Sequence, residues 1–196
     1  GGQDALLCLD AATGREVWRQ TYPAKPYGRH ATGDEGWYKG VSSTPEFDPA
    51  SGLLFTLSLD GDLRSWDART GRPGWHGNLY DQHRMGRRPG NRDYGYTSSP
   101  LVLGDTLFVE AGGPEGTVLA LDKRTGQRRW ASAYRGPAGH NGGPAPLTVE
   151  SVPCLALLAL HHLVVLRTDA GHEGKTVALV PWETEFNNNI ATATAW

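Results

Sequence analysis

The sequence predicts an all-β protein built from four-stranded antiparallel blades, forming an incomplete arc of a β-propeller. Three observations predict this fold: short apolar runs, a repeated turn motif, and a proline that keeps register with it. Glycine (26) and proline (13) are frequent among the 196 residues and interrupt the apolar runs before a helical period can build up. The fold class therefore depends on the repeats.

The clearest repeat is a turn motif in which Gly follows Asp by four positions and Trp follows Asp by eight. Self-similarity at a fixed period is the signature of repeat architectures. A looser fourth copy includes Asp169, Gly174 and Trp182. The three full copies are Asp10, Gly14, Trp18; Asp67, Gly71, Trp75; and Asp122, Gly126, Trp130.

A proline opens a strand-like run before each of the later copies. The intervals from Pro45 to Asp67 and from Pro100 to Asp122 are both 22 residues. From Pro146 to Asp169 the interval is 23 residues. Because two independent markers keep one register, the unit is a structural repeat. Units of roughly 40–50 residues with four antiparallel strands are typical of propeller blades.

The second unit illustrates the expected strands, A to D. Strand A spans 44–47 and strand B spans 53–59. Asp60-Gly61 predicts a two-residue type I′ hairpin, since Gly tolerates a positive φ. Strand C then ends at Asp67, and strand D spans 72–76.

The predicted organisation is three full blades between two partial ones, all in one propeller domain. We expect this arc to be a fragment of a longer chain whose missing blades are its partners. The expected divisions are 1–20 for a partial blade with strands C and D, 21–78, 79–133 and 134–183 for full blades, and 184–196 for the first strand of the next.

Each part of the turn motif has a structural reason. The Asp ends strand C, where its carboxylate can accept backbone N–H bonds of the following turn. The Gly can adopt the left-handed conformation that brings strand D back antiparallel. The Trp on strand D can pack on the adjacent blade, because a single blade cannot bury both of its faces. We therefore assign these residues to the scaffold and not to ligand binding.

Composition excludes some function classes. The net charge of −2 gives no basic stripe for nucleic acid. No run of about 18 apolar residues is present, so no transmembrane segment is predicted. Cys8 and Cys154 each lie in an apolar run, which favours small buried side chains over a disulfide.

Candidate binding residues lie in the long polar connections from strand D of one blade to strand A of the next. In a propeller these connections share one face with the B–C hairpins, and loops on a rigid scaffold often bind ligands. Arginine interleaved with aromatic residues is typical of protein-binding surfaces. The alternative is a solvated rim that contacts neighbouring loops. The candidates are Arg29, His30, Trp37, Tyr38, His83, Arg84, Arg87, Arg88, Arg92, Tyr94, Tyr96, His140, Asn141, Glu183, Glu185 and Asn187.

No metal site, catalytic residue or cofactor is predicted from the residues themselves. Asp60-Gly61-Asp62 lies on a hairpin and lacks the further oxygen ligands of a calcium loop. His161, His162 and His172 do not have metal-ligand spacing.

The motif Asp-x-x-Thr-Gly-x-x-x-Trp resembles the tryptophan-docking repeat of pyrroloquinoline-quinone-like (PQQ-like) β-propellers, and the resemblance covers nearly the whole chain. That family includes quinoprotein dehydrogenases and a non-catalytic propeller lipoprotein of outer-membrane β-barrel assembly. The resemblance implies the fold, and function must be argued from the site. It also implies a periplasmic or secreted location.

The quinoprotein dehydrogenases carry a vicinal cysteine pair, a calcium held by Glu and Asn, and a catalytic Asp. This sequence has no Cys-Cys pair, and no such set maps onto it position by position. We therefore expect a non-catalytic scaffold that binds other proteins or a small ligand at the loop face. The alternatives are part of a PQQ- and calcium-dependent alcohol or sugar dehydrogenase, or a sensor propeller fused to a kinase.

Overall fold

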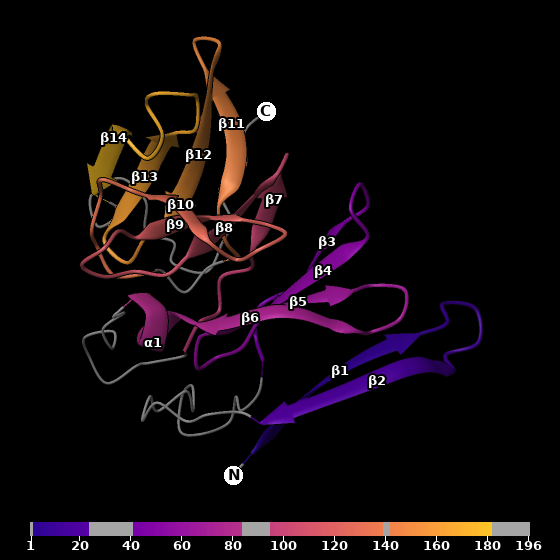
Figure 1. Ribbon diagram of the computed structural model, residues 1–196. Helices are drawn as coiled ribbons and strands as arrows, with labels where there is room; N and C mark the ends of the chain where they lie inside the picture. The colour runs from indigo at the N-terminus through magenta and orange to yellow at the C-terminus, as the bar shows by residue number, and fades with distance from the viewer. Residues whose placement is uncertain (1, 24–40, 84–94, 139–141, 182–196) are drawn as a thin grey trace.

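The computed structural model describes residues 2–23, 41–83, 95–138 and 142–181 (Figure 1). These residues form one two-stranded and three four-stranded antiparallel sheets. The fold is the predicted all-β propeller arc, and the four sheets are called blades 1 to 4 below.

The strands of each blade follow one another in the chain and pair with their sequence neighbours. Blade 1 contains β1 (Gln3–Leu9) and β2 (Glu16–Pro23). Blade 2 contains β3 (Glu46–Asp48), β4 (Leu53–Leu57), β5 (Asp62–Asp67) and β6 (Pro73–Asn78). Blade 3 contains β7 (Leu101–Leu103), β8 (Thr106–Glu110), β9 (Val118–Asp122) and β10 (Arg128–Ala131). Blade 4 contains β11 (Ala145–Val149), β12 (Val152–Leu158), β13 (His162–Arg167) and β14 (Thr176–Pro181).

The element bounds differ in detail from those expected. Strand β2 continues to Pro23, past the expected division at residue 20. The connection after β6 begins with a short helix, α1 (Leu79–His83), where the sequence analysis expected only a loop. The strand expected at 184–196 lies outside the described residues.

The Asp60-Gly61 turn is not the expected two-residue type I′ hairpin. The Ser58 N–H donates to the Asp62 carbonyl and the Gly61 N–H donates to the Ser58 carbonyl, so the loop has three residues. Gly61 has φ +81°, whereas type I′ requires positive φ at both central residues. Among the described non-glycine residues, only Glu150 and Ser151 have positive φ, and they form the two-residue turn between β11 and β12.

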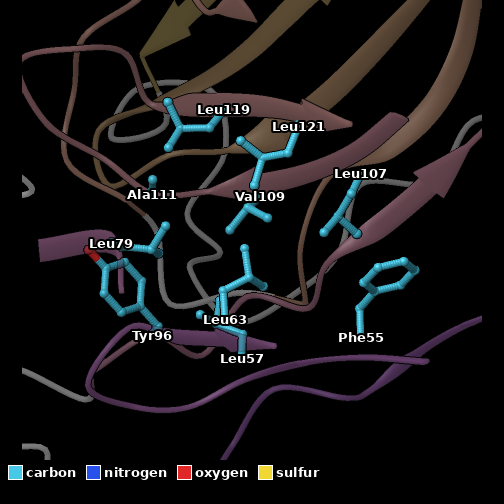
Figure 2. Close-up of a cluster of buried hydrophobic side chains, with 10 residues drawn as sticks. All are labelled: Phe55, Leu57, Leu63, Leu79, Tyr96, Leu107, Val109, Ala111, Leu119 and Leu121. Atoms are coloured by element: carbon cyan, nitrogen blue, oxygen red, sulfur yellow. The ribbon is translucent and has the colours of Figure 1, made fainter. Parts of the chain in front are cut away.

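Blades 2 and 3 pack face to face over a cluster of buried apolar side chains (Figure 2). Leu107 and Val109 of β8 point into this cluster. Phe108, between them, points to the opposite face and packs in a second cluster with β12 and β13 of blade 4. Both faces of blade 3 are therefore buried, which explains the nearly continuous apolar runs of β8 and β9.

The repeated Trp of one blade lies against the repeated Gly of the next. Trp75 Nε1 donates to the Lys123 carbonyl oxygen at 2.9 Å, and a Cβ built on Gly126 would lie 2.6 Å from Trp75 Cε3. Blades 1 and 2 repeat this arrangement, since Trp18 Nε1 donates to the Ala68 carbonyl oxygen at 3.1 Å. The indole thus takes the space that a side chain at the Gly position would fill.

The repeated Asp fixes the turn that carries this Gly. Asp10 Oδ1 accepts from the Thr13 backbone N–H at 2.8 Å and from its hydroxyl at 2.7 Å. Asp67 and Asp122 hold Thr70 and Thr125 in the same way. The bond from Thr13 lowers the pKa of the Asp10 carboxyl.

The fourth copy of the motif has a different register from the one read in the sequence. In blade 4 the Arg167 N–H donates to the Lys175 carbonyl and the Gly174 N–H donates to the Arg167 carbonyl. Asp122, Gln127 and Gly126 make the same bonds in blade 3. Arg167 therefore occupies the turn position assigned to Asp169, because this turn is three residues longer.

The Trp position of blade 4 is also displaced. Leu166 pairs with Thr176 as Leu121 pairs with Arg128, so Ala178 stands where blade 3 has Trp130. Trp182, to which the sequence analysis assigned this role, lies outside the described residues.

Candidate functional site

The B–C hairpins and the D-to-A connections lie together at one end of the blades, and this surface is called the hairpin face. It comprises hairpins 58–61, 111–117 and 159–161, with the described connection residues 41–45, 79–83, 95–100, 132–138 and 142–144. The C–D turns lie at the opposite ends of the same strands.

The connection between blades 2 and 3 is attached to one hairpin on both sides of residues 84–94. Before them, the Leu79 N–H donates to the Gly61 carbonyl at 2.9 Å. After them, the Tyr96 N–H donates to the Leu59 carbonyl at 2.9 Å. A Cβ on Gly61 would lie 2.9 Å from Tyr96 Cε2, so the hairpin residue must be small and must accept positive φ.

The connection between blades 3 and 4 is held against two hairpins. The Thr117 N–H donates to the Tyr134 carbonyl at 2.9 Å, and the Thr117 hydroxyl donates to the Gly136 carbonyl at 2.7 Å. From blade 4, the Leu160 N–H donates to the Pro137 carbonyl at 3.2 Å. Main-chain bonds therefore position the connections on a rigid scaffold, as binding loops require.

A buried carboxylate lies beneath this face in blade 3. Glu110 is 1% exposed and accepts a bond from the Ser98 hydroxyl at 2.6 Å. The paired strand positions of blades 2 and 4 hold Leu57 and Leu158, so blade 3 has an acid where its neighbours have leucine. Sequence reasoning missed Glu110, although an acid at the end of the apolar run Leu107–Val109 was a usable signal.

A second polar contact lies between blades 3 and 4. The Tyr134 hydroxyl lies 2.8 Å from His162 Nδ1, and the two rings meet edge to face with centroids 5.6 Å apart. Burial and the Glu110 carboxylate raise the pKa of Tyr134. The phenol is therefore kept neutral beside the imidazole.

A third group joins blades 2 and 3 near α1. His83 Nδ1 lies 3.6 Å from Glu115 Oε2, and Arg128 pairs with the same carboxylate. Burial lowers the pKa of the His83 imidazole, outweighing the effect of Glu115. His83, expected in a binding loop, is here a half-buried group between two blades.

Tyr96, which the sequence analysis expected to bind a ligand, is buried instead. Its side chain is 3% exposed and packs in the apolar cluster between blades 2 and 3 (Figure 2). Tyr96 therefore belongs to the core. The remaining binding-loop candidates lie outside the described residues: Arg29, His30, Trp37, Tyr38, Arg84, Arg87, Arg88, Arg92, Tyr94, His140, Asn141, Glu183, Glu185 and Asn187.

The described residues do not fit a quinone–metal centre. No three His, Cys, Asp or Glu side chains of the described ranges come together as metal ligands would. Cys8 on β1 and Cys154 on β12 are free thiols in different blades. Burial raises the pKa of the Cys154 thiol.

No helix within residues 2–23, 41–83, 95–138 and 142–181 is long and apolar enough to cross a membrane.

The repeated blades, the Trp–Gly contacts between them and the anchored connections define a β-propeller of the PQQ-like class. A family model described as "Outer membrane protein assembly factor BamB" matches residues 3–182. The chain belongs to this family of PQQ-like repeat propellers.

Curated relatives include two methanol dehydrogenases. The chain is 27% identical over 128 residues to "Methanol dehydrogenase [cytochrome c] subunit 1" of Paracoccus denitrificans, covering 63% of this chain and 19% of that protein. It is 33% identical over 92 residues to "Lanthanide-dependent methanol dehydrogenase" of Methylacidiphilum fumariolicum (strain SolV), covering 45% and 14%. The chain thus spans less than a fifth of the length of these two relatives.

Solved structures show the same fold. A europium-containing methanol dehydrogenase superimposes with a TM-score of 0.60 at 17% identity, covering 91% of this chain and 38% of that one. BamB from Moraxella catarrhalis superimposes with a TM-score of 0.53 at 16% identity, covering 86% and 41%. At these identities the likeness establishes the fold alone.

Proposed function

We propose that this propeller is a non-catalytic scaffold that binds another protein through its hairpin face. The observation that carries the proposal is the attachment of two D-to-A connections, those joining blade 2 to blade 3 and blade 3 to blade 4, to B–C hairpins by main-chain hydrogen bonds. Such bonds position a connection through its backbone, so its exposed side chains, such as Arg135, stay available for a ligand. The family description as an assembly factor supports a protein partner.

The repeat motif supports a separation between residues that hold the blades together and residues that could bind a partner. The Asp, Gly and Trp of the repeat are used within the turns and between blades. The sequence of the connections is not constrained by those contacts. Arg84, Arg87, Arg88 and Arg92 follow α1 directly, and arginine clusters suit carboxylate-bearing partner surfaces.

The proposal is tested with a photo-crosslinking residue at each end of blade 3 in the full-length protein. Arg135 is exposed on the hairpin face and Arg124 is exposed at the opposite C–D turn, so they form a matched pair. We expect a discrete protein adduct from position 135 in cells and none from position 124. We also expect the adduct to be lost when Arg84, Arg87, Arg88 and Arg92 are replaced by Gln. Equal labelling from both positions, or none, would contradict the proposal.

The second candidate is a segment of a quinone-dependent alcohol dehydrogenase, which the named curated relatives favour. Under this candidate the remainder of the full-length protein would supply the cofactor centre. Adding PQQ with calcium or a lanthanide to the full-length protein distinguishes the two. A bound-quinone absorbance with dye-linked alcohol oxidation would replace the scaffold proposal.

An extracytoplasmic location is part of the proposal, since the family is described by an outer-membrane factor. Fractionation of cells that produce the full-length protein tests it. Recovery in the cytosolic fraction would contradict it.

A further inference from the structure

Two adjoining grooves flank the outer strand of blade 2. The groove toward blade 1 has a volume of about 390 Å³ and is lined by Pro23, Asp62, Arg64, His76, Asn78 and Gln82, among others. The groove toward blade 3 has a volume of about 270 Å³, and its lining includes Trp75, His76, Gln82, His83, Gln127 and Arg128. They meet at His76 and Gln82 and are called the rim grooves below. These two shared residues belong to β6 and α1, which follow one another in Figure 1.

The charged groups of the groove toward blade 1 have partners inside the protein. Arg64 Nη2 lies 3.1 Å from Asp62 Oδ2, and the guanidinium stacks 4.2 Å from the centroid of the Tyr22 ring. Asp81, which also lines this groove, has a partner as well. A charged ligand would have to compete with these contacts.

The charged groups of the groove toward blade 3 also have partners inside the protein. Arg128 pairs with Glu115, and the same carboxylate faces His83. The lowered pKa of His83 keeps its imidazole uncharged near neutral pH. An anion would therefore find no unpaired arginine here, and a cation would find no unpaired carboxylate among the described lining residues.

Apart from the His76 imidazole, the groups left for a ligand are primary amides. Gln82 and Gln127 are exposed, and no hydrogen bond joins their side chains to another described residue. A primary amide has two donors and an acceptor, which matches the donor and acceptor of a hydroxyl group. The Gln82 amide packs against Gly77 of β6, so a Cβ at residue 77 would collide with it.

Trp75 adds an apolar surface to the groove toward blade 3. Its indole is half-buried, and its N–H is already used by the Lys123 carbonyl at 2.9 Å. The ring therefore offers carbon atoms and no free donor to a ligand. An apolar ring beside a few oriented polar groups is the usual composition of a small-molecule site.

We propose that the rim grooves bind a neutral polyhydroxylated ligand, namely a short oligosaccharide. Hydroxyl groups match the amides of Gln82 and Gln127, and the apolar face of a sugar ring matches the Trp75 indole. The internally paired charges argue against an ionic ligand. The rim grooves share α1 with the hairpin face. The inference is still independent of the hairpin-face proposal, because it concerns a different ligand class and its test measures sugar binding alone.

The test is titration of the full-length protein with maltohexaose, xylohexaose and chitohexaose. Isothermal titration calorimetry gives the Kd for each sugar. We expect saturable binding of at least one of these sugars. We also expect Gln82→Ala and Gln127→Ala each to weaken it at least tenfold.

The matched control is Gln3→Ala, which removes an exposed glutamine on β1 outside the grooves and should leave the Kd unchanged. Thermal unfolding of each variant checks that the blades remain folded, and Gln127→Ala alone decides the result if Gln82→Ala disturbs α1. Absence of saturable binding by all three sugars would overturn the proposal. Binding that Gln127→Ala leaves unaltered would overturn it too.

Discussion

The C–D turns of blades 1 to 3 and the C–D turn of blade 4 close on the same backbone bonds with different side chains. In blade 3, Asp122 holds Thr125, and Trp75 from blade 2 lies on Gly126. In blade 4, Arg167 stands at the Asp position and pairs with Asp169 within a longer turn. Gly126 and Gly174 have φ of +72° and +75°, so the left-handed glycine is the shared element.

This difference separates two tasks that one motif performs. The left-handed Gly and its backbone bonds bring strand D back, and this task survives the loss of Asp, Thr and Trp in blade 4. The Asp–Thr contact and the Trp are additional, and they stabilise the turn and the junction between blades. The variants below test that separation in the full-length protein, by chemical denaturation unless stated.

The largest expected effect follows removal of an interblade indole. Trp75→Ala should lower the free energy of unfolding by about 3–5 kcal/mol, because it leaves a cavity between blades 2 and 3. Trp75→Phe should cost less than Trp75→Ala, since the phenyl ring keeps most of the apolar area. Its remaining cost is the lost hydrogen bond to the Lys123 carbonyl. Leu179→Ala on β14, an exposed side chain, should change stability by no more than about 0.5 kcal/mol. A similar loss for Trp75→Ala and Leu179→Ala would mean that the indole does not stabilise the junction.

The next effect compares two left-handed glycines of blade 3. Gly104, in the turn between β7 and β8, has φ +57° and nothing within 4 Å of where a Cβ would lie, so Gly104→Ala should cost about 1–2 kcal/mol from the left-handed backbone alone. Gly126→Ala should cost about 1–3 kcal/mol more, because its Cβ would overlap Trp75. In a Trp75→Ala background this extra cost should disappear. Equal costs in the wild-type background would contradict the close approach of the indole.

A smaller effect distinguishes the two aspartates. Asp122→Ala should lower the free energy of unfolding by about 1–2 kcal/mol, because it removes the acceptor for the Thr125 N–H and hydroxyl. Asp169→Ala should cost less, because that carboxylate pairs with Arg167 and His172 near solvent, where ion pairs contribute little to stability. A larger loss for Asp169→Ala would indicate that the longer turn depends on its ion pair.

The smallest expected effect is a dependence of stability on pH below about 4, to which Asp122 and Asp169 both contribute. The guanidinium of Arg129 holds the pKa of Asp122 at about 2, and that of Arg167 holds the pKa of Asp169 at about 2. Because both values lie below the unfolded value of about 3.9, this stabilisation is present above pH ~4 and is lost as pH falls toward 2. Asp122→Asn and Asp169→Asn should each flatten the fall of the denaturation midpoint between pH 4 and 2. Arg124→Ala, in the same turn of blade 3 but without a partner in these pairs, should leave the slope unchanged.

Lys123 shows why part of the fold could not be predicted. In the sequence it is an unremarked residue after the repeat Asp, yet its side chain is buried between blades. Its ammonium lies 2.7 Å from Asp48 Oδ2 in blade 2, and it holds the pKa of Asp48 at about 2. The pair joins positions 75 residues apart, and no local pattern specifies such a contact.

The sequence alone determined the blades, because spacing is a local property. Asp, Gly and Trp at fixed offsets specify a turn and a returning strand, and repetition of that unit specifies a propeller. Only the tertiary structure decided which side chains face a neighbouring blade. It buried Tyr96, paired Lys123 with Asp48, placed Arg167 at the position assigned to Asp169 and brought Gln82 and Gln127 to adjoining grooves. These outcomes depend on the packing of one blade against the next, which sequence spacing does not encode.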